Sequence, residues 1–171
     1  MSQVGNQNAY IRNGLADDQD TISTKTDAEG KFELPYPETD FLLICLGKEG
    51  LFQHEGTADG KPLELTLEPW AVVEDKFLRG DQPIGDQEIR LNFSDPYVEN
   101  RPRAYWHYNA KTAADGSFRF ERVRAGDASV GREMKYAEAQ SSWMNTTTHT
   151  TNVSLEAGET AKIILGGEGR T

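Results

Sequence analysis

The sequence predicts an all-β protein made of two antiparallel β-sandwich units in tandem, of which the first is incomplete. Three observations support this prediction. One turn-centred segment occurs twice, apolar and polar residues alternate with the two-residue period of half-buried strands, and no segment has a convincing helical period. Many short strands separated by Gly, Pro and Asp are typical of β-sandwiches.

Length and composition exclude several classes of protein. The chain has 171 residues, enough for one domain or two small ones. Its 18 basic and 28 acidic residues give a net charge of −10, which argues against a nucleic-acid partner because phosphates are neutralised by clustered Lys and Arg. The longest apolar run, residues 41–46, is far shorter than the roughly 18–20 residues that cross a bilayer. We therefore expect no nucleic-acid partner and no membrane contact, and the single cysteine, Cys45, excludes an intramolecular disulfide.

The first part of the repeat is a predicted hairpin. Residues 24–34 match residues 110–120 with an offset of 86, and Lys, Thr, Ala, Gly and Phe coincide. Each copy carries an Asp that can bond the turn backbone and a Gly where a positive φ is needed. These turn residues are Asp27 and Gly30 in the first copy, and Asp115 and Gly116 in the second. The apolar residues expected to be buried after the turns are Phe32, Leu34, Phe118 and Phe120.

The second part of the repeat is a short glycine turn that leads into a closing strand. Residues 59–67 match residues 157–165, with an offset of 98 between Gly60 and Gly158. Leu65 and Leu67, or Ile163 and Leu165, then alternate. The other predicted strands are residues 41–46, 71–77, 88–93, 105–109, 128–132 and 146–155. The segment 133–142 is predicted to be a loop.

The two repeat copies divide the chain into predicted units of residues 1–69 and 70–171. The linker is short, so the units are expected to touch, and Trp70 is placed to be shared between them. The first unit has no counterpart of the opening strand of the second. We expect residues 9–12 to pair with the strand at residues 21–26 and so cover this open edge.

The repeat resembles the carboxypeptidase regulatory-like domains, which are similar to transthyretin and to the B-type repeats of collagen-binding adhesins. The resemblance rests on Thr-Asp-x-x-Gly-x-Phe near Gly30, on the opening strand and Gly-x-Pro turn of residues 70–85, and on the strand exit at residues 121–126. The C-terminal residues 164–170 look like the junctions between modules in large planctomycete-type surface proteins. The resemblance implies a seven-stranded, prealbumin-like Greek-key sandwich, partners among other domains of a longer polypeptide, and an extracytoplasmic location at the cell surface or in the periplasm.

Residues suited to catalysis are sparse in the sequence. The three histidines, His54, His107 and His149, are far apart, and neither a metal-binding pair nor a nucleophile beside a base is recognisable. Asp27 and Glu29 are better explained by turn formation than by calcium, which needs several oxygens at alternating positions. In the carboxypeptidases the domain of this type is the non-catalytic partner. We therefore expect no enzymatic activity, no cofactor and no metal.

Aromatic residues of the second unit are the candidate ligand or interaction surface: Tyr97, Tyr105, Trp106, Tyr108 and Trp143. Exposed aromatic rings stack on sugars, and Tyr and Trp are frequent anchors of protein interfaces. Alternation along residues 105–109 requires two of these rings to face the core. The predicted function is a structural spacer or protein-interaction module of a larger protein, with carbohydrate binding, or an accessory role beside a peptidase, as alternatives.

Overall fold

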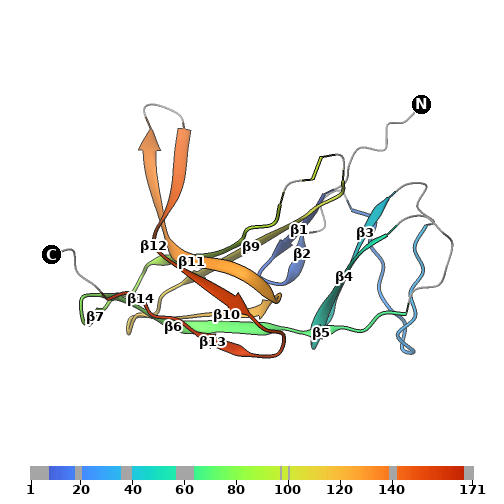
Figure 1. The fold of residues 1–171 in the computed structure, drawn as a ribbon, viewed down its shortest axis with the longest axis horizontal. Helices are drawn as coiled ribbons and strands as arrows, with labels where there is room; N and C mark the ends of the chain where they lie inside the picture. The colour runs from blue at the N-terminus through green and yellow to red at the C-terminus, as the bar shows by residue number, and fades with distance from the viewer. Residues whose placement is uncertain are drawn as a thin grey trace.

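The computed structural model describes residues 8–17, 21–35, 40–56, 64–96, 98–99, 101–138 and 142–167, with the backbone alone for 135–138 and 142–145. This part of the chain is all-β (Figure 1). Its strands are β1 (Ala9–Arg12), β2 (Leu15–Asp17), β3 (Phe41–Leu46), β4 (Gly50–Gly56), β5 (Glu68–Pro69), β6 (Ala71–Arg79), β7 (Gln82–Pro83), β8 (Glu88–Phe93), β9 (Ala104–Lys111), β10 (Ser117–Val123), β11 (Gly126–Glu138), β12 (Ser142–Leu155), β13 (Thr160–Lys162) and β14 (Leu165–Gly166).

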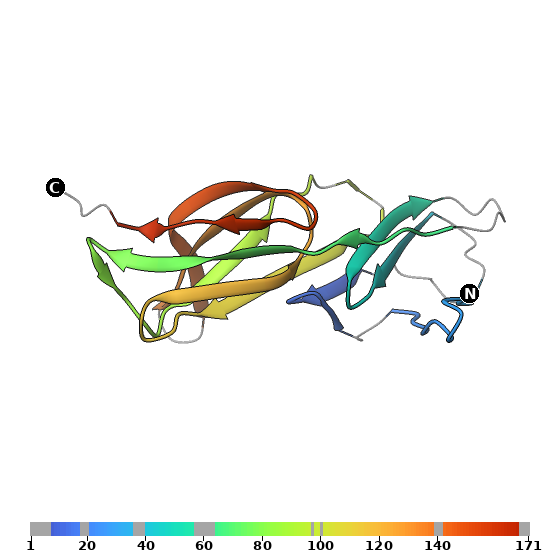
Figure 2. The ribbon, with the colours of Figure 1, turned by 90° about the horizontal axis from the view of Figure 1, so that it is seen from below.

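The strands form three sheets that are mostly antiparallel. A six-stranded sheet has the order β12-β11-β8-β9-β1-β2, and a three-stranded sheet has the order β3-β4-β5. In the five-stranded sheet β10, β13, β14 and β7 all pair with β6, which runs along the molecule between β3–β5 and β7 (Figure 2). The parallel pairings are β1 with β9, β13 with β6, and β14 with β6. An all-β fold with mostly antiparallel sheets is thus confirmed, whereas the tandem Greek-key sandwich stays a prediction.

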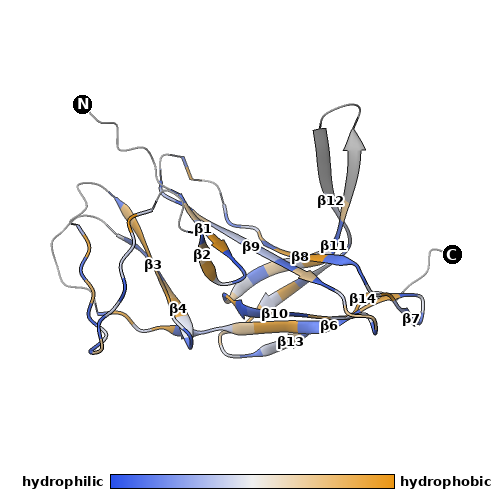
Figure 3. Cartoon of the chain, turned by 180° about the vertical axis from the view of Figure 1, so that it is seen from behind, coloured by the Kyte–Doolittle hydropathy of each residue, from blue (hydrophilic) through white to orange (hydrophobic). Residues whose placement is uncertain are grey.

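One hydrophobic core joins residues from all three sheets. The six-stranded sheet contributes Tyr108 and Val130, the five-stranded sheet contributes Val73 and Phe118, and β4 contributes Leu51. Hydrophobic stretches are visible on β3, β4 and β6, on both sides of the predicted unit boundary (Figure 3). Apolar side chains from opposite ends of the sequence therefore leave water together, which is the main force that stabilises the fold.

Most of the predicted strands outside the repeat segments are confirmed. Residues 41–46 and 88–93 match β3 and β8, and the other predicted segments lie within β6, β9, β11 and β12. Both repeat turns are also confirmed. Gly30 and Gly116 have φ angles of +79° and +78°, and the carboxylates of Asp27 and Asp115 accept backbone N–H groups of their turns. Phe118 and Phe120 are buried, as expected from their alternation.

The predicted loop at residues 133–142 is wrong. β11 continues to Glu138 and pairs with β12 from Ser142, so the two strands extend beyond β8 as a long ribbon that stands away from the sheets (Figure 1). Residues 133–136, Glu-Met-Lys-Tyr, alternate in polarity, but four residues are the shortest stretch from which alternation predicts a strand.

The predicted strands on both sides of the first turn are wrong. Residues 21–26 and 31–35 form no strand, and Phe32 and Leu34 are only half-buried. The turn is held by its own Asp27, but nothing in the described chain pairs with the segments that flank it. The closing segment of the first unit likewise has no strand at residues 64–67, and Leu67 is exposed. Turn chemistry is local, whereas a strand requires a partner.

The predicted pairing of residues 9–12 with residues 21–26 is also wrong. β1 turns back onto β2 through Asn13 and Gly14, both with positive φ, which is the preferred geometry of a two-residue Asn-Gly hairpin. Its other edge pairs in parallel with β9, with Ala9 opposite Ala104 and Arg12 opposite His107. The N-terminal strand therefore extends a sheet of the second unit and does not cover an edge of the first.

The burial of Ile11 makes this pairing testable by mutation. Ile11 is 1% exposed in the core, whereas Ile22 is 63% exposed in a segment without strand. We expect Ile11→Val to lower the free energy of unfolding by about 1 kcal/mol and Ile22→Val to leave it nearly unchanged. Urea unfolding followed by fluorescence measures both. Equal unfolding midpoints for the two variants would contradict the docking of β1 against the core.

Trp70 connects the two predicted units. Its indole Nε1 donates a hydrogen bond to the carbonyl oxygen of Gly47 at 3.0 Å, and its ring packs against the common core. The contact expected across the boundary is thus present. The division of the chain at residues 69 and 70 itself stays a prediction, and β1 and β2 lie in a sheet with strands of the second unit.

Candidate functional site

The candidate surface lies on the outer side of the six-stranded sheet, where β9 presents every second side chain. Trp106 and Tyr108 point into the core, with exposed fractions of 7% and 0%. Tyr105 and His107 therefore point outward, and both are half-buried. Because β9 carries a ring at four consecutive positions, one strand supplies both core packing and an aromatic surface.

The parallel pairing of β1 with β9 adds a third ring to this surface. Tyr10 lies opposite Tyr105, and their rings stack with 5.1 Å between centroids and 16° between planes. The Tyr10 ring is also parallel to His107, at 6.4 Å and 4°. Tyr10 is 40% exposed. We call Tyr10, Tyr105 and His107 the aromatic band.

Two arginines lie beside the aromatic band. Arg12 lies opposite His107 in the β1–β9 register, and the Arg103 guanidinium lies 5.4 Å from the centre of the Tyr105 ring. Burial lowers the pKa of His107, and the charges of Arg90 and Arg12 lower it further. The neutral form of His107 is accordingly favoured, in which one ring nitrogen donates a hydrogen bond and the other accepts one.

A polar hollow of about 280 Å³ lies beside the aromatic band on the same sheet. It is lined by residues of β8, β11 and β12: Arg90, Asn92, Glu133, Thr146 and Thr147. Arg90 reaches Glu133 across the sheet, with 3.4 Å between Nη1 and Oε1. The Nε atom of Arg90 is buried without a hydrogen-bond partner in the described part of the chain. Hydroxyl, amide and charged groups thus line a depression next to stacked rings.

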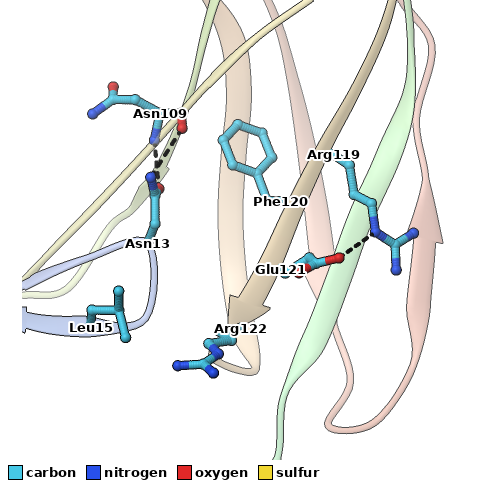
Figure 4. A pocket seen from close by; sticks show the side chains of 7 residues that line it. All are labelled: Asn13, Leu15, Asn109, Arg119, Phe120, Glu121 and Arg122. Atoms are coloured by element: carbon cyan, nitrogen blue, oxygen red, sulfur yellow. Dashed lines mark hydrogen bonds and ion pairs between the residues drawn. The ribbon is translucent and has the colours of Figure 1, made fainter. Parts of the chain in front are cut away.

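A larger hollow of about 440 Å³ opens between β10 and the β1–β2 turn, and several of its polar groups are already paired (Figure 4). Asn13 and Asn109 exchange two hydrogen bonds. Arg119 pairs with both Glu121 and Glu74. Its one aromatic residue, Phe120, is buried and offers no stacking face. This hollow is therefore a poorer candidate than the aromatic band with the polar hollow.

The structure separates the five aromatic residues predicted as a surface. Tyr105 is on the surface. Trp106 and Tyr108 are corrected to core residues: their rings are parallel at 6.3 Å, and the Tyr108 hydroxyl donates a hydrogen bond to the carbonyl of Arg122. Burial raises the pKa of the Tyr108 hydroxyl well above its usual range, so it stays protonated. Tyr97 and the side chain of Trp143 lie outside the described residues.

Tyr10, His107 and Arg90 belong to the candidate surface but were not singled out from the sequence. Alternation along β9 could have placed His107 on the same face as Tyr105. Alternation along β8 likewise places Arg90 on the outer face, because its neighbours Ile89 and Leu91 are buried. Nothing local to Tyr10 indicates its partner, because the pairing connects strands that are 95 residues apart, from Ala9 to Ala104.

The described residues contain no cluster of three or more His, Cys, Asp or Glu side chains that could hold a metal ion. Nor does the described part of the chain form a helix long and apolar enough to cross a membrane.

Comparison with known proteins yields one distant structural similarity. No protein-family model matches the sequence, and no curated protein matches it. The structure is similar to the crystal structure of a "putative carbohydrate binding protein" from Pseudomonas aeruginosa, with a TM-score of 0.37 and 13% sequence identity over 58% of this chain and 88% of that one. The resemblance to carboxypeptidase regulatory-like domains therefore stays a prediction.

Proposed function

We propose that this chain is a non-catalytic module that binds carbohydrate on the outer face of its six-stranded sheet. The observation that carries the proposal is the aromatic band, in which Tyr10 stacks on Tyr105 and lies parallel to His107 beside a polar hollow. Sugar rings present apolar C–H faces and a rim of hydroxyls. Flat aromatic rings can pack against the C–H faces, and the Asn92 amide and the Thr147 hydroxyl can form hydrogen bonds with the sugar hydroxyls.

The shape of the sheet favours an extended ligand. The aromatic band and the polar hollow span β1, β9, β8, β11 and β12, which are neighbours in one sheet. An oligosaccharide lying across these strands would meet the stacked rings first and then the hollow. Because the strands are held by backbone pairing and by a buried inner face, the surface is rigid before the ligand arrives, which lowers the entropic cost of binding.

A glycan array that carries neutral, uronic-acid, sulfated and sialylated oligosaccharides tests the proposal. Tyr10→Ala and Tyr105→Ala are each expected to weaken binding to the bound glycans roughly threefold to tenfold, the size of one lost aromatic contact. Tyr10→Phe keeps the ring and should bind nearly as the parent chain does. Phe32→Ala, which removes a half-buried ring that is part of neither the aromatic band nor the polar hollow, is the control. An array without any bound glycan would overturn the proposal.

A protein-interaction module is the second candidate function. The observation in its favour is the composition of the same surface, since Tyr10, Tyr105, Arg12 and Arg103 are of the residue types that dominate binding energy at protein interfaces. The partners would be other domains of a longer polypeptide, at an extracytoplasmic site. The absence of glycan binding together with saturable binding of a neighbouring domain would favour this candidate over the first.

A further inference from the structure

Arginine side chains gather on the candidate surface although the chain as a whole is acidic. The chain carries a net charge of −10. Three arginines nevertheless border the aromatic band: Arg12 on β1, Arg90 on β8, and Arg103, next to the start of β9. Clustered guanidinium groups attract anions.

Two of these arginines contact a carboxylate, but they differ in how completely their guanidinium groups are paired. Arg12 pairs with Asp17, with 2.7 Å between Nε and Oδ2. Arg90 has the longer contact of 3.4 Å with Glu133, whose side chain is only 9% exposed. The Arg90 Nε has no hydrogen-bond partner in the described part of the chain. The guanidinium of Arg90 is thus incompletely satisfied at the edge of the polar hollow, and such a group gains from an additional acceptor.

The pKa of His107 reflects two of these arginines. Burial lowers this pKa most, and the charges of Arg90 and Arg12 lower it further. Both guanidinium groups are therefore close enough to the centre of the aromatic band to act on it.

We infer that the ligand of this surface is an acidic glycan, whose sugar rings lie on Tyr10 and Tyr105 and whose anionic substituent is held between Arg90 and Arg12. The inference rests on the proposed carbohydrate-binding function and names the class of glycan. A carboxylate and a sulfate share the required chemistry, since both are oxyanions that accept paired hydrogen bonds from a guanidinium. Asn92 supplies an amide beside the same anion position.

The test uses the full chain on the same glycan array, with three variants. Arg90→Gln and Arg12→Gln each remove one charge from the site and are expected to weaken binding to acidic glycans by about tenfold, with little effect on neutral ones. Arg12 is 71% exposed, so its replacement leaves the core intact even if Arg90→Gln proves unstable. Arg79→Gln removes the same charge from an exposed position on β6 and is the matched control. Raised salt should weaken binding of the parent chain to acidic glycans more than binding to neutral ones.

The outcomes separate the inference from the proposed function. Binding dominated by acidic glycans that falls in Arg90→Gln or Arg12→Gln but not in Arg79→Gln supports the inference, and the carboxylated and sulfated members of the array show which oxyanion is preferred. Binding of neutral glycans at equal strength, lost in Tyr10→Ala, would overturn the inference and leave carbohydrate binding intact. No glycan binding at all would overturn both.

Discussion

Replacing Phe118 by alanine is expected to lower the free energy of unfolding by about 3–5 kcal/mol. Phe118 is 4% exposed on β10 and packs edge-to-face on Phe120, with 6.0 Å between ring centroids. The substitution removes a ring from a core that closes three sheets, and the sheets cannot move together without breaking the backbone pairing of β10 with β6. Chemical denaturation followed by fluorescence, together with the melting temperature, measures the loss.

Phe32→Ala is the matched control for this prediction. Phe32 occupies the position after the first repeat turn that Phe118 occupies after the second, but it is half-buried in a segment without strand. The same atoms are removed from a site where they are partly exposed to water, so the free energy of unfolding should fall much less. Equal losses in the two variants, or an unchanged melting temperature in Phe118→Ala, would contradict the assignment of β10 to the core.

The contrast between Phe32 and Phe118 shows what a sequence repeat can predict. Both copies form their turn, because Asp27 and Asp115 bond backbone groups within four residues and need no other part of the chain. Only the second copy forms a strand, because β6 lies beside it. The eleven matching residues are thus enough to predict the turn. They do not predict whether a strand forms, because its pairing partner lies outside the matching segments.

The residues of the candidate surface show the same contrast between what a local pattern predicts and what only strand pairing determines. Residues 105–108 read Tyr-Trp-His-Tyr, with a ring at each position, so alternation predicts that two rings are buried but hydrophobicity does not say which two. The core of the other sheet decides, and it selects Trp106 and Tyr108. Tyr10 joins the surface only through the parallel pairing of β1 with β9, which no local pattern encodes. The Asn13-Gly14 turn was a readable signal for the β1–β2 hairpin, but not for its place in the sheet.

Gly116→Val is expected to destabilise the protein by about 2–6 kcal/mol, more than the equivalent change at Gly30. Both glycines have φ near +79°, a conformation that costs a β-branched residue about 1–3 kcal/mol. At Gly116 a Cβ would in addition lie 2.8 Å from the carbonyl oxygen of Phe77 and 3.0 Å from Cβ of Pro83. At Gly30 it would meet no atom within 4 Å. The additional loss of stability in Gly116→Val therefore comes from overpacking of the second turn against β6 and β7, which costs about 1–3 kcal/mol.

The pair Gly116→Val and Gly30→Val separates backbone strain from steric overlap. Because φ is nearly the same at both positions, the loss common to the two variants measures the strain, and the difference measures the contact with the Phe77–Pro83 segment. Gly116→Ala and Gly30→Ala repeat the comparison without a branched side chain, and the same order is expected because the first added carbon already makes the contact. Thermal unfolding of the four variants supplies the measurement. A larger loss at Gly30 than at Gly116 would show that the second turn is not packed against β6 and β7, and would remove the physical reason for a glycine there beyond its φ angle.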